Sequence, residues 1–84
     1  MARQHHYLKI ETAYYQAVEK DLKKFELRKN DRNYQKGDML HLKEVVNGIY
    51  TGRKLPPKEV KYILHGGEYG LDAEYCIMNW WLNV

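Results

Sequence analysis

The segment KKFELRKNDRNYQKGDMLHL, residues 23–42, changes the hydrophobic period of the chain and indicates its fold class. Phe25 and Leu27 alternate with charged residues, which is typical of a half-buried strand. A run of Asn, Asp and Gly residues follows, and these residues favour tight turns. A second apolar run then begins, with Leu40 and Leu42 at alternate positions. We therefore predict strand, turn and strand, with Phe25, Leu27, Leu40 and Leu42 pointing into the core.

A strand or extended arm at residues 6–11 and a helix over residues 12–23 are predicted before this segment. Thr12 stands where a helix N-cap is expected, because its hydroxyl can accept from a free backbone amide of the first turn. Apolar residues at helical spacing predict the buried stripe of this helix. They are Tyr14, Ala17, Val18 and Leu22.

After this segment the chain continues as strands separated by turn signals. Asn47-Gly48 lies between two apolar runs and predicts a type I′ hairpin turn. The strands expected in this part cover residues 39–46, 49–55, 58–65 and 74–84. One helix and about five strands predict a single α+β, mostly β domain over residues 1–84. In so short a chain, we expect the strands to curl into a small β-barrel, which removes exposed sheet edges.

Composition narrows the function classes. The net charge of +3 over 84 residues mildly favours anionic partners. Cys76 is the single cysteine, so it forms no internal disulfide and a reducing compartment is expected. No stretch has the length and apolarity of a membrane-spanning helix, and the first residues lack the apolar core of a signal peptide. We expect a soluble cytoplasmic protein without a membrane partner.

Basic residues are concentrated between Lys20 and Lys36, in and around the turn. Lys and Arg supply phosphate contacts to nucleic acids, and Tyr34 and Tyr69 offer rings on which bases can stack. The cations of this segment are Lys20, Lys23, Lys24, Arg28, Lys29, Arg32 and Lys36, set against Asp21, Glu26 and Asp31. The alternative is a solvated face whose surface ion pairs contribute about 0–1 kcal/mol each.

Lys23, Glu26 and Arg28 are the most specific cluster within this segment. Glu26 and Arg28 share one face of the predicted strand by period two, and Lys23 lies at the junction with the helix. Glu26 is placed to orient Arg28 toward a bound anion, and a partly buried Lys23 is a candidate base. The alternative is a purely structural ion pair that closes the barrel.

Short motifs spread over nearly the whole chain carry a family resemblance. They are His6–Ile10, Tyr15, Ala17-Val18, Lys23, Phe25–Arg32, Gly37-Asp38, Leu40, Tyr50–Arg53, Tyr62–Leu64 and Tyr69–Leu71. The FELRKNDR run followed by Gly37-Asp38 is the most specific of them. On these motifs the chain resembles the ASCH family of the PUA-like superfamily. More narrowly, it is similar to a bacterial and phage group of small uncharacterised ASCH-like proteins (DUF3850-like).

The resemblance implies a PUA-like β-barrel with a cleft between the barrel and the first helix. It also implies a module that binds RNA or a modified nucleoside in this cleft. The expected ligand-binding residues are His6, Lys23, Glu26, Arg28, Lys29, Asn30, Arg32 and Tyr69. No cofactor is expected.

Some ASCH proteins are amidohydrolases that remove the acetyl group of N4-acetylcytidine, which keeps an enzymatic alternative open. These enzymes use a Lys, a Thr and a Glu. Lys23 matches the Lys position, whereas Glu26 occupies the Thr position, so the nucleophile of the family is missing. Glu68 and Glu74 are candidates for the third residue. In this alternative, Lys23 and Glu26 transfer protons on an acylated nucleoside, and we favour binding over catalysis.

Two weaker patterns complete the sequence-based expectations. The four histidines have no recognised zinc spacing, and a lone cysteine adds no ligand set, so no metal site is expected. Neighbouring strand residues face opposite sides, so one of Trp80 and Trp81 is expected in the core. The other is then free for a homodimer contact.

Overall fold

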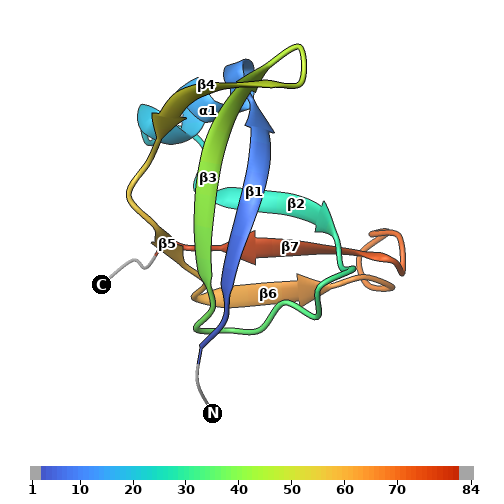
Figure 1. Ribbon diagram of the computed structural model, residues 1–84. Coiled ribbons are helices and arrows are strands. Elements are labelled where there is room, and N and C mark those ends of the chain that lie inside the picture. Colours follow the sequence, from blue (N-terminus) through green and yellow to red (C-terminus); the bar gives the residue numbers. More distant parts are fainter. Residues whose placement is uncertain (1–2, 82–84) are drawn as a thin grey trace.

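Residues 3–81 are described by the structure, a computed structural model, in which they form one helix and seven strands (Figure 1). The elements are β1 (His5–Glu11), α1 (Thr12–Glu19), β2 (Phe25–Lys29), β3 (Met39–Val46), β4 (Ile49–Lys54), β5 (Lys58–Glu59), β6 (Tyr62–His65) and β7 (Tyr75–Asn79). This confirms the mostly β, α+β class.

The strands form two sheets. In the first, β3 pairs with β1, β4 and β5, while the second has the order β2-β7-β6. Figure 1 shows the strands of the second sheet running across those of the first. Among residues 3–81 no strand pairing joins the two sheets, so the predicted barrel is not confirmed and stays a prediction.

The pairing of β1 with β3 is parallel, with Leu8 opposite Leu42. Parallel strands need a long crossover, and here α1, β2 and the basic turn lie between the two strands. Two backbone contacts align the strand starts, because Met39 N donates to Gln4 O at 2.9 Å and Gln4 N donates to the Asp38 carboxylate at 3.1 Å. Nothing in the local sequence of either strand indicates that these two distant segments pair.

The predicted hairpin is confirmed, and the strand predicted after it is corrected. Asn47 and Gly48 have φ of 50° and 80°, as a type I′ turn requires, and β3 and β4 pair antiparallel across them. The strand predicted over residues 58–65 divides into β5, which pairs with β3, and β6, which pairs with β7. The chain changes sheets at Val60, whose side chain is fully buried.

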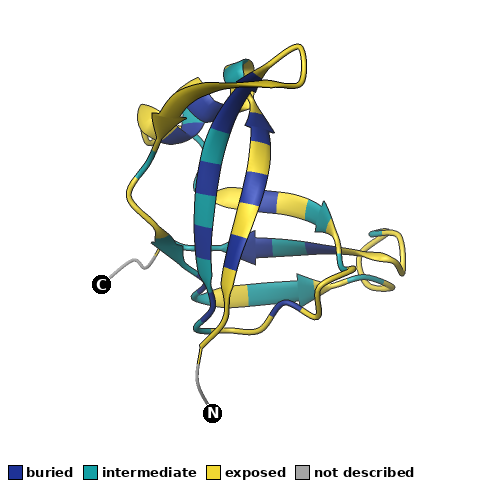
Figure 2. Cartoon of the chain, viewed as in Figure 1, coloured by how far each residue is buried: buried dark blue, intermediate teal, exposed yellow. Residues whose placement is uncertain are grey.

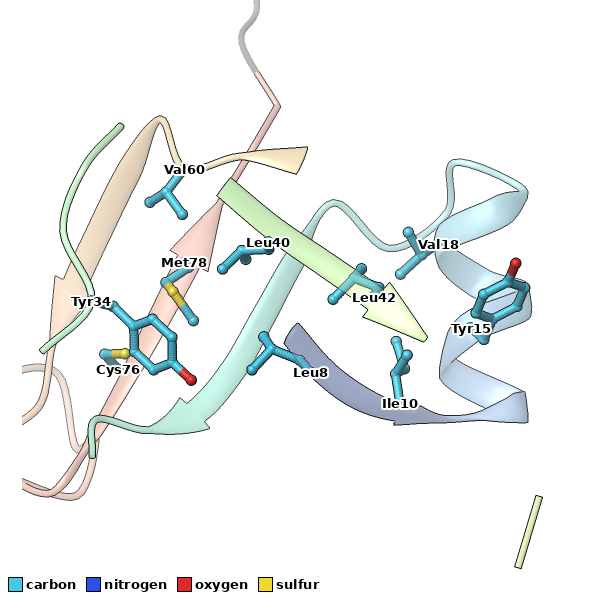
Figure 3. Packing of buried hydrophobic residues seen from close by; sticks show 10 residues of the cluster. All are labelled: Leu8, Ile10, Tyr15, Val18, Tyr34, Leu40, Leu42, Val60, Cys76 and Met78. Carbon is cyan, nitrogen blue, oxygen red and sulfur yellow. The ribbon is translucent and has the colours of Figure 1, made fainter. Parts of the chain in front are cut away.

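The core lies between the two sheets and extends to α1. Figure 3 shows Tyr15 and Val18 of the helix at one end of the cluster. The remaining members are Leu8, Ile10, Tyr34, Leu40, Leu42, Val60, Cys76 and Met78. Leu40 and Leu42 are therefore core residues, as predicted. Figure 2 shows the exposed and buried residues alternating along β1.

The prediction of which face of β2 is buried was wrong. Phe25 and Leu27 are 43% and 48% exposed, whereas Glu26 between them is 5% exposed. Period two divides a strand into two faces but does not say which face turns inward. Burying a carboxylate is tolerated here because it is paired with two cations, so the polar face of β2 turns toward the first sheet.

The helix is shorter than predicted and buries a different face. It ends at Glu19, and Asp21 follows with φ of 65°. Tyr15 and Val18 are its buried residues, while Tyr14 and Leu22 of the predicted stripe are 57% and 78% exposed. Within residues 3–81 no helix combines the length and the apolar character that crossing a bilayer demands.

The predicted N-cap is also corrected. Glu11 occupies the N-cap position without a side-chain cap. The Thr12 hydroxyl donates instead to Glu44 Oε2 at 2.7 Å. A local capping pattern was thus replaced by a contact with β3.

Candidate ligand-binding cleft

A cavity of about 570 Å³ lies between β1, the start of α1 and β2. Its walls include three aromatic side chains, Tyr14, Phe25 and Tyr75. The complete lining is Lys9, Ile10, Glu11, Tyr14, Lys23, Phe25, Glu26, Leu27, Arg28, Lys29 and Tyr75, and we call it the β1–β2 cleft. Its volume falls in the range of small-molecule sites, in which apolar walls surround a few polar groups.

The buried polar group of the cleft is the Glu26 carboxylate. Lys23 Nζ donates to its Oε1 at 2.8 Å, and Arg28 Nε donates to its Oε2 at 2.6 Å. The side chains of Lys23 and Arg28 are 16% and 28% exposed, so water still reaches both cations. The sequence-based cluster therefore exists as one ion triad with a net charge of +1.

Lys23 is further positioned by aromatic rings. Its ammonium lies 5.3 Å from the ring centroids of both Tyr14 and Phe25. Such cation–π contacts hold the ammonium at the cleft wall. Tyr14 and Phe25, which appeared to be core residues in the sequence, are thus wall residues of the cleft.

Arg28 and Arg32 bind the free edge of β1. Gln4 O faces β3, so by period two the carbonyls of Tyr7 and Lys9 face the other side. Arg28 donates to Lys9 O, and Arg32 donates to Tyr7 O at 3.2 Å. Both arginines therefore satisfy acceptors of an unpaired strand edge, a structural role that the sequence did not indicate.

His6 lies outside the lining of the cleft, in a buried polar pair. One of its ring nitrogens is 2.8 Å from the Asp38 carboxylate, and both side chains are about 5% exposed. Burial raises the pKa of Asp38, but hydrogen bonds from His6 and from the Gln35 and Gln4 amides outweigh it and hold that pKa below its usual value. This pair joins the starts of β1 and β3.

Tyr34 packs edge-on against His6, with ring centroids 4.6 Å apart. It is 1% exposed, so the predicted stacking face of Tyr34 is wrong. Burial raises the pKa of its hydroxyl, and the nearby Arg32 and Arg28 oppose that rise. Its ring contributes to the core instead.

The other predicted ligand residues are spread along the chain. Lys29 lines the cleft, and its ammonium is 3.9 Å from Glu74. Asn30 shapes the turn, because its side-chain oxygen accepts from Tyr34 N at 3.0 Å. Tyr69 is 91% exposed and, like Asn30 and Arg32, is not part of the cleft lining. The fold thus brings Lys23, Glu26, Arg28 and Lys29 together.

A third buried carboxylate, Glu44, was missed by sequence reasoning. It accepts from the hydroxyls of Thr12 and Thr51 at 2.7 Å each, and these bonds hold its pKa below the usual value. Arg53 lies 3.7 Å from it and bridges to Glu19 at 2.7 Å. This network fastens α1 to β3 and β4, so a structural role accounts for it.

The remaining sequence-based expectations concern the C-terminal part and the metal ligands. Trp80 packs against the core and Trp81 is 46% exposed, as the alternation predicted, and the Lys24 ammonium lies 5.0 Å from the Trp81 ring. The homodimer through this residue stays a prediction.

Cys76 is buried, and burial raises the pKa of its thiol. Within the described part of the chain, no three His, Cys, Asp or Glu residues gather as metal ligands.

The fold and the cleft define a small, mostly β domain with a ligand-sized cavity above a buried ion triad. The chain belongs to the family described as "Domain of unknown function (DUF3850)", whose model matches residues 5–80. This confirms the narrower part of the resemblance, while ASCH membership stays a prediction.

A protein of Escherichia phage P2, described as "Uncharacterized 12.9 kDa protein in GpA 3'region", is similar to this chain. The two are 46% identical over 50 residues, which are 60% of this chain and 46% of the phage protein. The match therefore spans less than half of the length of that relative.

Proposed function

We propose that this protein is a cytoplasmic module that binds RNA or a nucleoside in the β1–β2 cleft. The observation that carries the proposal is the Glu26 triad, a polar group of fixed geometry beneath aromatic walls. Nucleobases offer a flat apolar face and a polar edge, and this lining matches both features. The proposal includes a PUA-like, ASCH-type barrel as the parent architecture.

The charges around the cleft support an anionic ligand. Lys9, Lys23, Arg28 and Lys29 line it together with two carboxylates, Glu11 and Glu26, so cations exceed anions. Lys9 and Lys29 are exposed and do not contact Glu26, and the contact of Lys29 with the exposed Glu74 is long at 3.9 Å, so a phosphate can reach both ammoniums. The base would lie between Tyr14, Phe25 and Tyr75.

A hydrolase acting on an acylated nucleoside is the second candidate. The observation that favours it is the Lys23–Glu26 contact of 2.8 Å inside the cleft. In this mechanism water would attack the acyl carbon, the pair would pass a proton from that water to the leaving amine, and Arg28 would stabilise the oxyanion that forms on the acyl oxygen. Binding is the better supported function, because both Glu26 oxygens already accept from cations and neither is directed only at a substrate.

The test is ligand-observed NMR with a panel of nucleosides, nucleoside monophosphates and short RNAs. Tyr75→Ala removes a cleft wall, and Tyr62→Ala, which removes an exposed tyrosine of the same sheet outside the cleft lining, is the matched control. We expect binding to weaken in Tyr75→Ala and in Lys23→Gln, and to persist in Tyr62→Ala.

Chromatography of the same mixtures separates the two candidates. Unchanged ligand after prolonged incubation supports a binding module. A deacylated product that is lost in Lys23→Gln would replace it by the hydrolase. Failure of the wild type to bind any member of the panel at low salt would overturn the proposed cleft function altogether.

A further inference from the structure

The outward face of the first sheet carries tyrosine and lysine side chains from three strands. Along β1 the residues at odd positions are exposed, because Leu8 and Ile10 between them enter the core (Figure 2). The same alternation directs Leu40 and Leu42 of β3 inward. By this alternation and the strand register, the outward residues include a group that we call the tyrosine–lysine face: His5, Tyr7 and Lys9 of β1, His41 and Lys43 of β3, and Tyr50 and Lys54 of β4.

Register and contacts unite these side chains into one surface. Tyr7 stands opposite His41, and their rings stack with centroids 4.4 Å apart and an interplanar angle of 21°. The Lys43 ammonium lies 5.3 Å from the Tyr7 ring and 5.7 Å from the Tyr50 ring. The Lys9 ammonium also lies 5.7 Å from the Tyr50 ring. Two rings on different strands therefore share one cation, Lys43.

The rings remain open to solvent in spite of these contacts. Tyr7 is 56% exposed and Tyr50 is 53% exposed. Apolar rings of this size expose area that a partner can cover, and two of them on one sheet face form a flat surface. Cross-strand packing accounts for the histidine and lysine contacts, but it leaves more than half of each tyrosine exposed.

The lysines give this face a positive charge. Among residues 3–81 no ion pair involves Lys9, Lys43 or Lys54, and Lys43 stands directly opposite Lys54. Like charges on paired strands repel, so this arrangement costs stability unless an anion bridges them. Glu11 at the end of β1 is the carboxylate nearest along that strand.

We propose that the tyrosine–lysine face binds single-stranded nucleic acid, with bases stacked on Tyr7 and Tyr50 and phosphates on the three lysines. Surfaces of this kind combine a positive charge with aromatic rings, which every base can cover. An acidic peptide or an anionic membrane would pair with the lysines but has no flat group for the rings. Nucleic acid matches both features at once.

This inference goes beyond the proposed cleft function and does not depend on it. Lys9 is the one residue of the face that also lines the β1–β2 cleft. Tyr7, Lys43, Tyr50 and Lys54 lie outside the cleft lining. Failure of either proposal is therefore visible separately, through variants that touch a single surface.

The test is fluorescence anisotropy of the full chain with labelled 12-nucleotide RNA and DNA strands over a series of salt concentrations. Tyr7→Ala and Tyr50→Ala remove one ring each without a change of charge, and Tyr62→Ala is the matched control on the other sheet. We expect affinity to fall about fivefold to a hundredfold for each lost ring, as one base–aromatic stack predicts. Tyr62→Ala should bind as the wild type does.

Lys43→Gln provides a second, independent readout. We expect the slope of log affinity against log salt concentration to decrease by about 0.7, the effect of one lost contact to a single-strand phosphate. The tyrosine variants should keep the wild-type slope. Circular dichroism of each variant confirms that it is folded, which is expected because the substituted side chains are more than half exposed or lie on the outer face.

Three outcomes would overturn the proposal. The first is wild-type affinity that is unmeasurable at low salt. The second is equal affinity of Tyr7→Ala, Tyr50→Ala and Tyr62→Ala, which would reduce the face to a charged surface. The third is competition by a poly-glutamate peptide or by anionic phosphatidylserine vesicles at least as strong as by unlabelled RNA. Loss of binding in the ring variants with Tyr75→Ala unaffected would support this face and count against the cleft.

Discussion

Glu26→Gln is the perturbation that most directly tests the ion triad. The substitution keeps the shape of the side chain and removes its charge. Lys23 and Arg28 then lose a carboxylate that accepts from them at 2.8 and 2.6 Å. One amide oxygen remains as an acceptor, but the amide nitrogen turns a donor toward the second cation.

The structure sets the size of the effect. A hydrogen bond to a charged group contributes about 1.5–3 kcal/mol, and two such bonds are changed here. Lys23 and Arg28 are 16% and 28% exposed, so solvent screening reduces both contributions toward the lower end. Because the amide retains one acceptor, we expect the free energy of unfolding to fall by about 2 kcal/mol. For a domain of this size, that corresponds to about 8–16 °C in Tm.

The assay is urea unfolding followed by tryptophan fluorescence, since Trp80 packs against the core and reports on its loss. Glu74→Gln is the matched control, because that carboxylate is 70% exposed and lies 3.9 Å from Lys29. We expect the control to change stability by less than about 0.5 kcal/mol. Equal unfolding midpoints for the two variants would refute the argument that Glu26 holds the two cations at the cleft.

Three further predictions concern the fold that supports the two surfaces. Leu42→Ala should lower the free energy of unfolding by about 2–5 kcal/mol in the same urea assay, because Leu42 is fully buried, and a loss below 1 kcal/mol would contradict its place in the core. The folded-state pKa of Asp38 is lowered, so its stabilisation is present above the unfolded-state pKa of about 3.9 and is lost as the pH falls through the folded value. Urea midpoints measured at steps of about 1 pH unit between pH 5 and 3 should therefore decrease less for Asp38→Asn than for the wild type. Parallel plots of midpoint against pH for the two proteins would refute this assignment. Gly48→Ala should lower Tm by several degrees, at a cost of about 1 kcal/mol, since Gly48 has φ of 80°, and an unchanged Tm in differential scanning calorimetry would contradict the type I′ turn.

Both surfaces combine residues that are close in sequence with residues that come together only in the folded chain. Lys23, Glu26 and Arg28 lie within six consecutive positions, so their proximity was readable from helix-to-strand spacing. Tyr14 and Tyr75, which wall the same cleft, come from α1 and the start of β7 and meet only in the folded chain. The tyrosine–lysine face similarly depends on the pairing of β3 with both β1 and β4.

Sequence alone determined the features that arise from neighbouring residues. Asn47-Gly48 defined a hairpin, because few other residue pairs adopt positive φ at both central positions. Alternation in residues 39–46 placed Leu40 and Leu42 on one buried face. The mostly β class followed from these short periodic runs separated by turns.

Tertiary structure alone decided which face of each element turned inward and which strands became neighbours. Phe25 and Leu27 looked like core residues, yet β2 buries Glu26 together with Lys23 and Arg28, and Arg28 donates to Lys9 O at the free edge of β1. Thr12 looked like a cap, yet it donates to Glu44 on β3. Each decision depends on a partner many residues away or on a charge balance across elements. Local periodicity contains neither, because it describes the order of side chains along one segment and not the surface against which that segment packs.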